Sequence, residues 1–338
     1  MKPRREAGMA DLLLEWYRRG HRDLPWRRSQ DPYRIWVSEI MLQQTRAQAV
    51  IPYYERFLQS FPTVEALAAA REEDVLARWA GLGYYSRARN LWRAAGQIAA
   101  TGTFPSTYDA IRALPGIGDY TAAAIASIAF GLPHAVIDGN VLRVVARVEN
   151  DAADIASSRT KDRFRAVAQS WLDPSQPGAF NQALMELGAT LCLPRHPQCL
   201  VCPLAARCRG RQEATAEQLP VKLRTVVPVQ LERTLLLIRD GPRVLLSQHA
   251  RDARHMAGFW DLPETAGLPG SSQTVRPGRL LGEFRHTITH HHYRIAVRAA
   301  SLRGPVPSGH AWFDPAQFAD IPLSTTARKA LKLTGLIE

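Results

Sequence analysis

Apolar residues along the first 150 positions recur with the spacing of buried or amphipathic helices. The run Leu12–Tyr17 predicts an amphipathic helix, and the apolar positions within 35–42 predict a buried one. Thr63–Trp79 has the pattern of two short helices. The small residues of 122–128 and the apolar residues of 141–145 predict two more helices that pack closely. We therefore expect this part of the chain to be helical.

The pattern changes near position 225. Residues 211–225 are polar and predict a linker. Alternating and apolar runs of β type follow, and they predict strands at Val226–Ile238, Arg243–Gln248, Leu280–Phe284 and Tyr293–Leu302. A second domain of a different structural class is therefore expected after the linker.

Composition and charge limit the kind of partner. The 338 residues, 46% of them hydrophobic, can bury the cores of one or two domains, and the net charge of +12 favours a polyanionic partner. The apolar stretch near Leu12 is too short for a signal peptide, and no run of about 18 apolar residues could span a membrane. We expect a monomeric cytoplasmic protein that has no contact with membranes.

The stretch Leu114–Thr121 has the pattern of a helix-hairpin-helix turn. Gly116 and Gly118 allow a sharp turn and close approach to another surface, and Ile117 between them would anchor the turn in the core. The N–H groups of the turn and the start of the next helix, near Asp119, would then face a phosphate. An ordinary turn between two helices is the alternative interpretation of this stretch.

Glu39 is a candidate general acid because it lies inside an apolar helical segment. Burial penalises the charged form of a carboxyl group and raises its pKa, and a carboxyl group that stays protonated near neutral pH can donate a proton. The alternative is a Glu that is paired with one of the many Arg residues.

Asp138 precedes an apolar helix and is placed at or near its N-cap, where the positive end of the helix favours the ionised form. Two carboxyl groups in opposed environments, such as Glu39 and Asp138, suit acid-assisted cleavage of a glycosidic bond. Asp is also a common N-cap that has no chemical role.

Aromatic and basic residues stand side by side at two turns, and both suit contact with nucleic acid. Trp26 and Arg27 lie in the first turn. Tyr84 lies in the second, within Gly81–Arg87, just before a basic helix. Gln44, near the end of the segment that contains Glu39, offers an amide that can read base edges. Surface loops and core tyrosines would explain the same residues.

The chain has four cysteines in one block, Cys192, Cys199, Cys202 and Cys208. Their closeness indicates a metal centre, either zinc or an iron–sulfur cluster, and the spacing alone does not choose between the two. No cysteine remains for disulfides, which agrees with a reducing compartment.

In this order, several segments of the chain closely resemble the adenine DNA glycosylases of the MutY type. These segments are LPWR, SEIMLQQT, GLGYYSR, LPGIGDYT, VIDGN, FNQALMELG and the cysteine block. The resemblance implies a multidomain protein with an all-α region of the endonuclease III superfamily and then an α+β Nudix-like domain. It divides the chain into a helical catalytic region at 1–210, a linker at 211–225 and a Nudix-like domain at 226–338. Within the helical region, the helix-hairpin-helix covers about 108–130 and the cluster loop covers 192–208. It also implies that the cysteines bind a [4Fe-4S] cluster.

The resemblance assigns roles to individual residues. Glu39 matches the acid that protonates adenine N7, and Asp138 matches the carboxylate that stabilises the sugar cation or bonds to it transiently. Tyr120 and Asn140 match residues that support this pair. Related bifunctional enzymes have a nucleophilic lysine at position 120, so a monofunctional glycosylase is expected.

The resemblance also extends to DNA contacts. The residues that match DNA-facing positions are Trp26, Arg27, Gln44, Tyr84 and Gln182, together with Gly116 and Gly118 of the hairpin. A base within a duplex must be extruded before it can react, and a mispair lowers the cost of that step. The expected partner is double-stranded DNA that contains adenine opposite 8-oxoguanine or guanine.

The second domain resembles a Nudix domain that lacks its metal ligands. Gly258–Glu264 matches the start of a Nudix box, but the following residues, Thr265–Pro277, contain no carboxylate, so pyrophosphate hydrolysis is not expected. Adenine glycosylases use such a domain to recognise 8-oxoguanine. Thr289 and His290 match the recognition loop, with Thr in place of the usual Ser and Ile288 in place of Phe. The neighbouring histidines suggest either a metal site or a DNA contact, and the lack of acidic residues nearby favours DNA.

Two other function classes remain open at this stage. One is another glycosylase of the endonuclease III superfamily, which acts on oxidised pyrimidines or mismatched thymine. The other is a lesion-binding protein without catalysis, although such a protein would not need both Glu39 and Asp138. From its expected substrate, we expect the protein to be associated with the nucleoid.

Overall fold

The computed structural model describes residues 8–223, 227–250, 256–264 and 275–337. The chain divides into two compact units: one consists of Met1–Glu65 and Arg93–Thr225, and the other of Ala66–Trp92 and Val226–Glu338. The first unit is helical, and the second combines helices with a mixed sheet. The expected fold class, a helical region followed by a Nudix-like domain, is confirmed.

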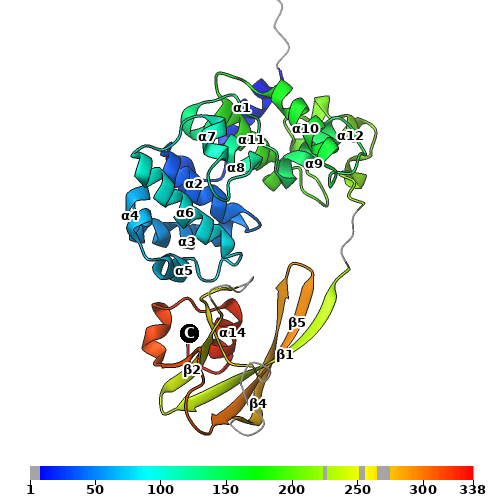
Figure 1. Ribbon diagram of the computed structural model, residues 1–338. Coiled ribbons are helices and arrows are strands. Elements are labelled where there is room, and N and C mark those ends of the chain that lie inside the picture. The colour runs from blue at the N-terminus through cyan, green and yellow to red at the C-terminus, as the bar shows by residue number, and fades with distance from the viewer. Residues whose placement is uncertain (1–7, 224–226, 251–255, 265–274, 338) are drawn as a thin grey trace, which may run out of the picture. The chain divides into compact units, whose positions relative to one another are not determined.

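The first unit contains short helices joined by turns and loops (Figure 1). In chain order they are α1 (Met9–Gly20), the 3-10 helix η1 (Pro25–Arg28), α2 (Pro32–Leu42), α3 (Ala47–Ser60), α7 (Tyr108–Arg112), α8 (Asp119–Phe130), α9 (Gly139–Val148), α10 (Ser158–Trp171), α11 (Pro177–Thr190) and α12 (Arg209–Gln212), with single 3-10 turns at Cys199–Val201, Ala205–Arg207 and Ala216–Gln218. Helix α6 (Ser86–Thr101) begins in the second unit and ends in the first.

Local sequence explains where the helices of the site begin and end. Asp31 caps α2 by accepting a hydrogen bond from the Tyr33 N–H, and Pro32 takes the first helical position. Asp138 caps α9 in the same way, through the Val141 N–H at 2.7 Å. Helix α8 ends at Gly131, whose φ of 66° is left-handed.

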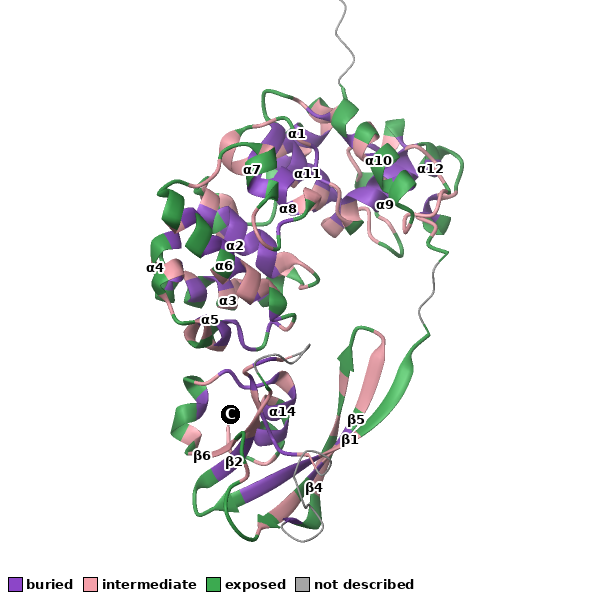
Figure 2. Ribbon diagram, viewed as in Figure 1, coloured by how far each residue is buried: buried purple, intermediate pink, exposed green. Residues whose placement is uncertain are grey.

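Helices α8, α9 and α11 pack around one hydrophobic core, which α1 and α10 complete. Figure 2 shows the buried residues concentrated on the facing sides of these helices. Small residues permit the close approach. A Cβ on Gly188 of α11 would lie 2.6 Å from the Asn140 Cβ, and one on Gly178 would lie 2.7 Å from the Ser127 carbonyl oxygen. The packing of α11 therefore fixes the start of α9.

Helix α4 (Val64–Ala69) begins in the first unit and ends in the second, which also contains α5 (Glu72–Trp79) and a mixed sheet with its own helix. Its remaining elements are β1 (Val229–Asp240), β2 (Arg243–Gln248), β3 (Trp260–Asp261), β4 (Val275–Ile288), β5 (His291–Leu302), β6 (His310–Phe313), the 3-10 helix η6 (Pro315–Ala319) and α14 (Thr325–Leu333). The strand order is β3-β2-β1-β5-β4, and β6 pairs with β2. Strands β4 and β5 form an antiparallel hairpin, and β1 runs parallel to β5 from Val229 opposite His291.

The core of the sheet consists of buried residues of β1, β2 and β5 together with apolar residues of α14. Within this unit, the centres of the Tyr85 and Phe259 rings lie 3.9 Å apart, and the Arg89 side chain donates a hydrogen bond to the Ala257 carbonyl oxygen. These contacts join residues 66–92 to the segment that matches the start of a Nudix box.

The structure contains all four predicted strands, with different bounds for three of them; β1 runs from Val229 to Asp240, whereas Val226–Ile238 was predicted. β2 has the predicted bounds, whereas β5 begins two residues before Tyr293 and β4 begins at Val275, five residues before Leu280. β4 contains Pro277 and a register shift between Pro277 and Leu280, which hides its period from the sequence. Val226 and residues 265–274 lie outside the described part of the chain.

Candidate active site

A cavity of about 510 Å³ lies within the first unit, between η1, α2, α8, α11 and the start of α9. Seven of the residues that the sequence singled out line it. They are Trp26, Arg27, Glu39, Tyr120, Asp138, Asn140 and Gln182. Residues that are up to 156 positions apart in the chain, Trp26 and Gln182, therefore meet at one site.

Glu39 is the buried carboxyl group of this cavity, and its exposed fraction is 4%. Tyr120 donates a hydrogen bond of 2.6 Å to its Oε2. Burial raises the pKa of Glu39 to about 7, although the hydrogen bond from Tyr120 lowers it; the nearby Asp138 raises it further and Arg27 lowers it. A group with this pKa is partly protonated at neutral pH and can donate a proton.

Asp138 is fixed by its own helix. Its Oδ1 accepts from the Val141 N–H at 2.7 Å, and its Oδ2 accepts from Asn140 Nδ2 at 2.9 Å. Burial raises the pKa of Asp138, against the lowering effect of these hydrogen bonds and of the Arg143 charge. The hydrogen bonds at the helix start favour the ionised form, as the sequence predicted. Burial has the larger effect, so the net result is a raised pKa for Asp138.

A carboxylate that the sequence analysis missed forms part of the cavity wall. Glu186 of α11 is 1% exposed and accepts hydrogen bonds from Arg22 Nε at 2.8 Å, Arg22 Nη2 at 2.7 Å and Arg27 Nη2 at 2.7 Å. Burial alone would raise its pKa, but the two guanidinium groups outweigh burial and lower it to about 2. The apolar neighbours of Glu186 within FNQALMELG could have revealed it, since the same argument identified Glu39.

Two more side chains shape the wall. The Tyr17 hydroxyl donates to the Gln182 Oε1 at 3.3 Å, which turns the Gln182 amide nitrogen away from Tyr17. Trp26 is buried, and its ring packs edge-on against the Tyr54 ring, with the two ring centres 5.6 Å apart. Trp26 therefore belongs to the cavity wall and is not a surface-loop residue.

Arg143 links the start of α9 to the end of α11. Its Nη2 donates to the Asn140 Oδ1 at 2.8 Å and to the Gly188 carbonyl oxygen at 2.6 Å, and its Nε donates to the Cys192 carbonyl oxygen at 2.7 Å. Asn140 in turn holds Asp138. One guanidinium group thus connects the Asp138 carboxylate to the cysteine segment.

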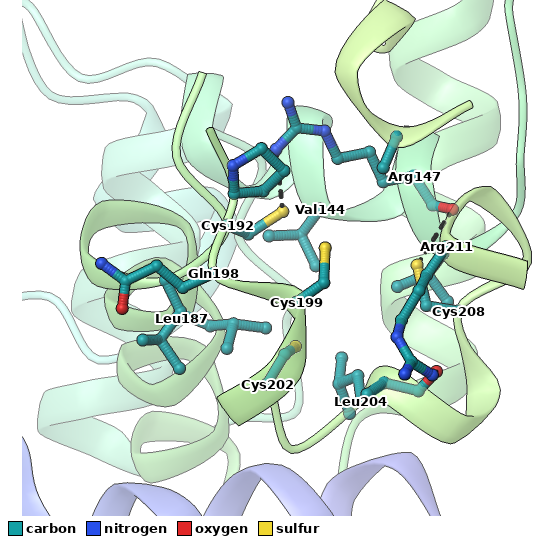
Figure 3. Close-up of a pocket in the computed structure, with 15 residues that line it drawn as sticks. Val144, Arg147, Leu187, Cys192, Gln198, Cys199, Cys202, Leu204, Cys208 and Arg211 are labelled. Atoms are coloured by element: carbon teal, nitrogen blue, oxygen red, sulfur yellow. Dashed lines mark hydrogen bonds between the residues drawn. The ribbon is translucent and has the colours of Figure 1, made fainter. Parts of the chain in front are cut away.

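The four cysteines line one pocket, together with the apolar side chains Val144, Leu187 and Leu204. Figure 3 shows them on segments that surround this pocket, with Arg147 donating to the Cys192 Sγ at 3.3 Å. None of the four forms a disulfide. No group of three or more His, Cys, Asp or Glu in the described residues is placed to hold a metal ion.

The hairpin predicted at Leu114–Thr121 joins α7 to α8, which begins at Asp119 as expected. Gly116 has a left-handed φ of 76° that favours glycine. Gly118 has an ordinary φ of −99°, and a Cβ at that position would meet no atom within 4 Å. Ile117 is buried between them. Of the two hairpin glycines, only Gly116 therefore has a backbone conformation that favours glycine.

The remaining predicted DNA-facing residues do not line the cavity: Gln44 lies just past α2, and Tyr84, Thr289 and His290 belong to the second unit. Gln44, Tyr84 and Thr289 all have left-handed backbone, with φ of 59°, 49° and 53°. Such backbone is uncommon for residues with a side chain, above all for β-branched Thr, and it often marks functional positions. Gln44, Tyr84 and Thr289 are all exposed.

The Nudix-like segment holds its carboxylates in internal contacts. Glu264 pairs with Arg233, and Asp261 accepts a hydrogen bond from the Thr326 hydroxyl at 2.9 Å. The continuation Thr265–Thr274 lies outside the described residues. In the part of the chain that the structure describes, no helix has the length and hydrophobicity to cross a membrane.

Two family models match the chain. Residues 37–171 match the HhH-GPD superfamily of base excision DNA repair proteins, and residues 233–333 match the NUDIX domain. Among solved structures, a thermostable thymine-DNA glycosylase is similar to 60% of this chain over 95% of its own, with a TM-score of 0.54 and 28% identity. An endonuclease III trapped on DNA covers 61% of this chain and 95% of its own with a TM-score of 0.52 and 21% identity, which shows a shared fold.

The curated relatives extend over both units. The adenine DNA glycosylase of Homo sapiens is 34% identical over 95% of this chain and 73% of its own length. That of Rattus norvegicus is 33% identical over 95% of this chain and 77% of its own. The enzyme of Arabidopsis thaliana is 44% identical over 59% of this chain and 36% of its own. The chain belongs to the adenine DNA glycosylase family.

Proposed function

We propose that the protein removes adenine that is mispaired with 8-oxoguanine or guanine from duplex DNA, by acid-assisted cleavage of the N-glycosidic bond. The observation that carries this proposal is the pair of carboxyl groups, Glu39 and Asp138, that line one cavity, where the Asp138 charge helps to raise the pKa of Glu39. The curated names of the relatives support adenine as the base that is released.

Glu39 supplies the proton in this scheme. In its protonated form it donates to N7 of an extruded adenine, so that the protonated base takes the electron pair of the broken bond and leaves as neutral adenine. The hydrogen bond from Tyr120 occupies Oε2 and leaves Oε1 to carry the proton toward the base. Without that proton the adenine anion would be a poor leaving group.

Asp138 stabilises the sugar. Its carboxylate, held by Val141 and Asn140, faces the positive charge that develops at C1′ as the bond breaks, or bonds to C1′ transiently. Water then adds to C1′ and leaves an abasic site. No lysine is among the described residues that line the cavity, and position 120 is Tyr, so the strand is not cut by an amine.

The cysteine pocket is the site we assign to a [4Fe-4S] cluster. Four thiol donors around one pocket suit a cluster of several iron atoms, whereas the described residues are not placed to hold a single metal ion. The Arg147 N–H group at 3.3 Å from Cys192 Sγ suits a thiolate. Cys192, Cys199, Cys202 and Cys208 would hold the cluster, which would fix the cysteine segment against α9 and α11.

The second unit reads the opposite base in this proposal. Thr289 and His290 form the two-residue turn of the β4–β5 hairpin, where an exposed hydroxyl and an imidazole can reach a base edge. The Glu264–Arg233 pair supports a binding role, because that carboxylate is already neutralised by a cation. A monomer on chromosomal DNA would be sufficient for the reaction.

The test is adenine release under single-turnover conditions from a duplex with adenine opposite 8-oxoguanine. Adenine release with intact strands before alkali treatment is the expected result. Parallel duplexes that carry thymine opposite guanine, or an oxidised pyrimidine, test the other glycosylases of the superfamily. Release of a pyrimidine base and retention of adenine would overturn the proposal.

A further inference from the structure

Glu186 is the third carboxyl group of the cavity, and the scheme above leaves it without a role. Among the described residues that line the cavity, the acidic ones are Glu39, Asp138 and Glu186. Glu186 is not a second general acid, because the two guanidinium groups outweigh its burial and lower its pKa to about 2. Its two oxygens are used by the side chains of Arg22 and Arg27 and by the Arg22 backbone N–H at 3.2 Å.

Glu186 joins the two arginines into one rigid group. Arg27 also donates from Nη1 to the Arg22 carbonyl oxygen at 2.9 Å, and its guanidinium carbon lies 5.5 Å from the centre of the Tyr17 ring. The Arg27 side chain is 10% exposed and the Glu186 side chain 1% exposed. A charge pair this well sheltered from water keeps most of its electrostatic effect on neighbours.

The charged groups around Glu39 set its proton affinity. The Tyr120 hydroxyl faces it from α8, the Asp138 carboxylate from the start of α9, and the Arg27 guanidinium from η1. From α11 the cavity wall presents Gln182 and Met185, which are neutral, and Glu186, which is paired with Arg27. Arg22 and Arg46 add two further cations to the same wall. A cation beside a carboxyl group favours the ionised form, which cannot donate a proton.

We propose that Glu186 is a positioning residue for the general acid: it holds Arg22 and Arg27 in the cavity wall and cancels part of their charge, so that Glu39 keeps its proton near neutral pH. Because Glu186 carries a negative charge and contacts both guanidinium groups, it offsets part of the positive field that they exert on Glu39.

A neutral residue of the same shape separates this electrostatic role from a structural one. Glu186→Gln retains the size of the side chain but removes the negative charge, so the charge of Arg27 acts on Glu39 without compensation. Arg27→Gln removes the cation itself. Both variants disturb the hydrogen bond between Arg27 Nη2 and Glu186 Oε2, yet the proposal predicts shifts of opposite sign, which general loosening of the site cannot produce.

The first readout is the titration of Glu39 itself. NMR of the full-length protein with labelled Glu monitors the side-chain carboxyl carbons as the pH changes. The Glu39 signal is assigned as the one that disappears in Glu39→Gln. The expected midpoint of the unsubstituted protein is about 7. We expect Glu186→Gln to lower the midpoint by about one pH unit and Arg27→Gln to raise it. Glu15→Gln, which breaks the exposed Glu15–Arg19 pair, is the matched control and should leave the midpoint in place.

The second readout is the pH profile of single-turnover adenine release, and only this readout rests on the proposed function. The alkaline limb of the profile should move in the same direction as the NMR midpoint for each variant. If the unsubstituted protein releases no adenine, the proposed function fails while the NMR titration still decides the role of Glu186.

The result that would overturn the inference is a folded Glu186→Gln protein whose Glu39 midpoint is unchanged or raised. If that variant does not fold, Arg27→Gln and Glu186→Asp decide: Arg27→Gln must raise the midpoint, and Glu186→Asp, which keeps the charge, must leave it near that of the unsubstituted protein. Failure of either would reduce Glu186 to a structural ion pair.

Discussion

At the scale of single residues, the site depends on a carboxyl group that is costly to bury. An ordinary Glu has a pKa near 4.5, and burial raises that of Glu39 to about 7. The folded state therefore binds a proton more tightly than the unfolded chain between these two values. The stabilisation from this proton is fully present below pH 4.5 and is lost as pH rises through 7.

Glu39→Gln should abolish adenine release, because an amide has no acidic proton to give, and should leave DNA affinity nearly unchanged. The same variant should raise the apparent Tm at pH 8 relative to the unsubstituted protein, and by less at pH 5, since Gln never ionises. The difference of about 2.5 pH units between the pKa values of 4.5 and 7 limits this gain in the free energy of unfolding to about 3 kcal/mol. Single-turnover kinetics, duplex binding and thermal melts at both pH values measure these effects; unchanged turnover would remove Glu39 from its assigned role.

Tyr120→Phe tests the hydrogen bond on the Glu39 Oε2. This bond lowers the pKa of Glu39, so its loss should move the alkaline limb of the rate profile to higher pH. The maximal rate at low pH should fall several-fold, because the acid loses the group that orients it. A limb that moves to lower pH in the Phe variant would contradict this role for the hydroxyl.

At the scale of elements, local pattern was sufficient where a helix or strand is defined by its own residues. The small-residue run of α8, the N-cap Asp138 of α9 and the whole of β2 are examples. Pairings that join distant segments were not predictable. The parallel pairing of β1 with β5 extends β5 back to His291, where a histidine run has no β period. The bonds of Glu186 to Arg22 and Arg27 likewise span 164 and 159 positions.

Gly188→Ala tests how closely α11 must approach α9. A Cβ there would lie 2.6 Å from the Asn140 Cβ and 3.1 Å from the Asn140 backbone, so α9 must shift and carry Asp138 with it. We expect a loss of about 1–3 kcal/mol in stability and a larger loss in the rate of adenine release than in DNA affinity.

Gly96→Ala is the matched control for this substitution. Gly96 also lies inside a helix, α6, but nothing lies within 4 Å of its Cβ position. The added methyl group should stabilise that helix by up to about 1 kcal/mol and leave the rate unchanged. Equal kinetic effects of the two substitutions would show that α11 does not position Asp138.

At the scale of the whole molecule, the proposed function places recognition and chemistry in different units. The cavity with Glu39 and Asp138 belongs to the first unit, and the hairpin turn Thr289-His290 belongs to the second. The sequence could assign both through motifs, but only the structure shows that residues 66–92, including Tyr84, group with the second unit. The choice of an adenine opposite 8-oxoguanine would then require both units to contact one duplex.

Thr289 offers a test that separates stability from recognition. Its φ of 53° is unfavourable for a β-branched residue, so Thr289→Gly should relieve backbone strain and raise the Tm of the protein. If the hydroxyl reads the opposite base, the same variant should lose much of its preference for 8-oxoguanine over guanine, whereas Thr289→Ser should keep it. The preference is measured as the ratio of rates and of affinities on duplexes with adenine opposite 8-oxoguanine and opposite guanine. A Gly variant that keeps the full preference would show that the side chain of Thr289 does not read the opposite base. Recognition would then depend on other groups of the second unit.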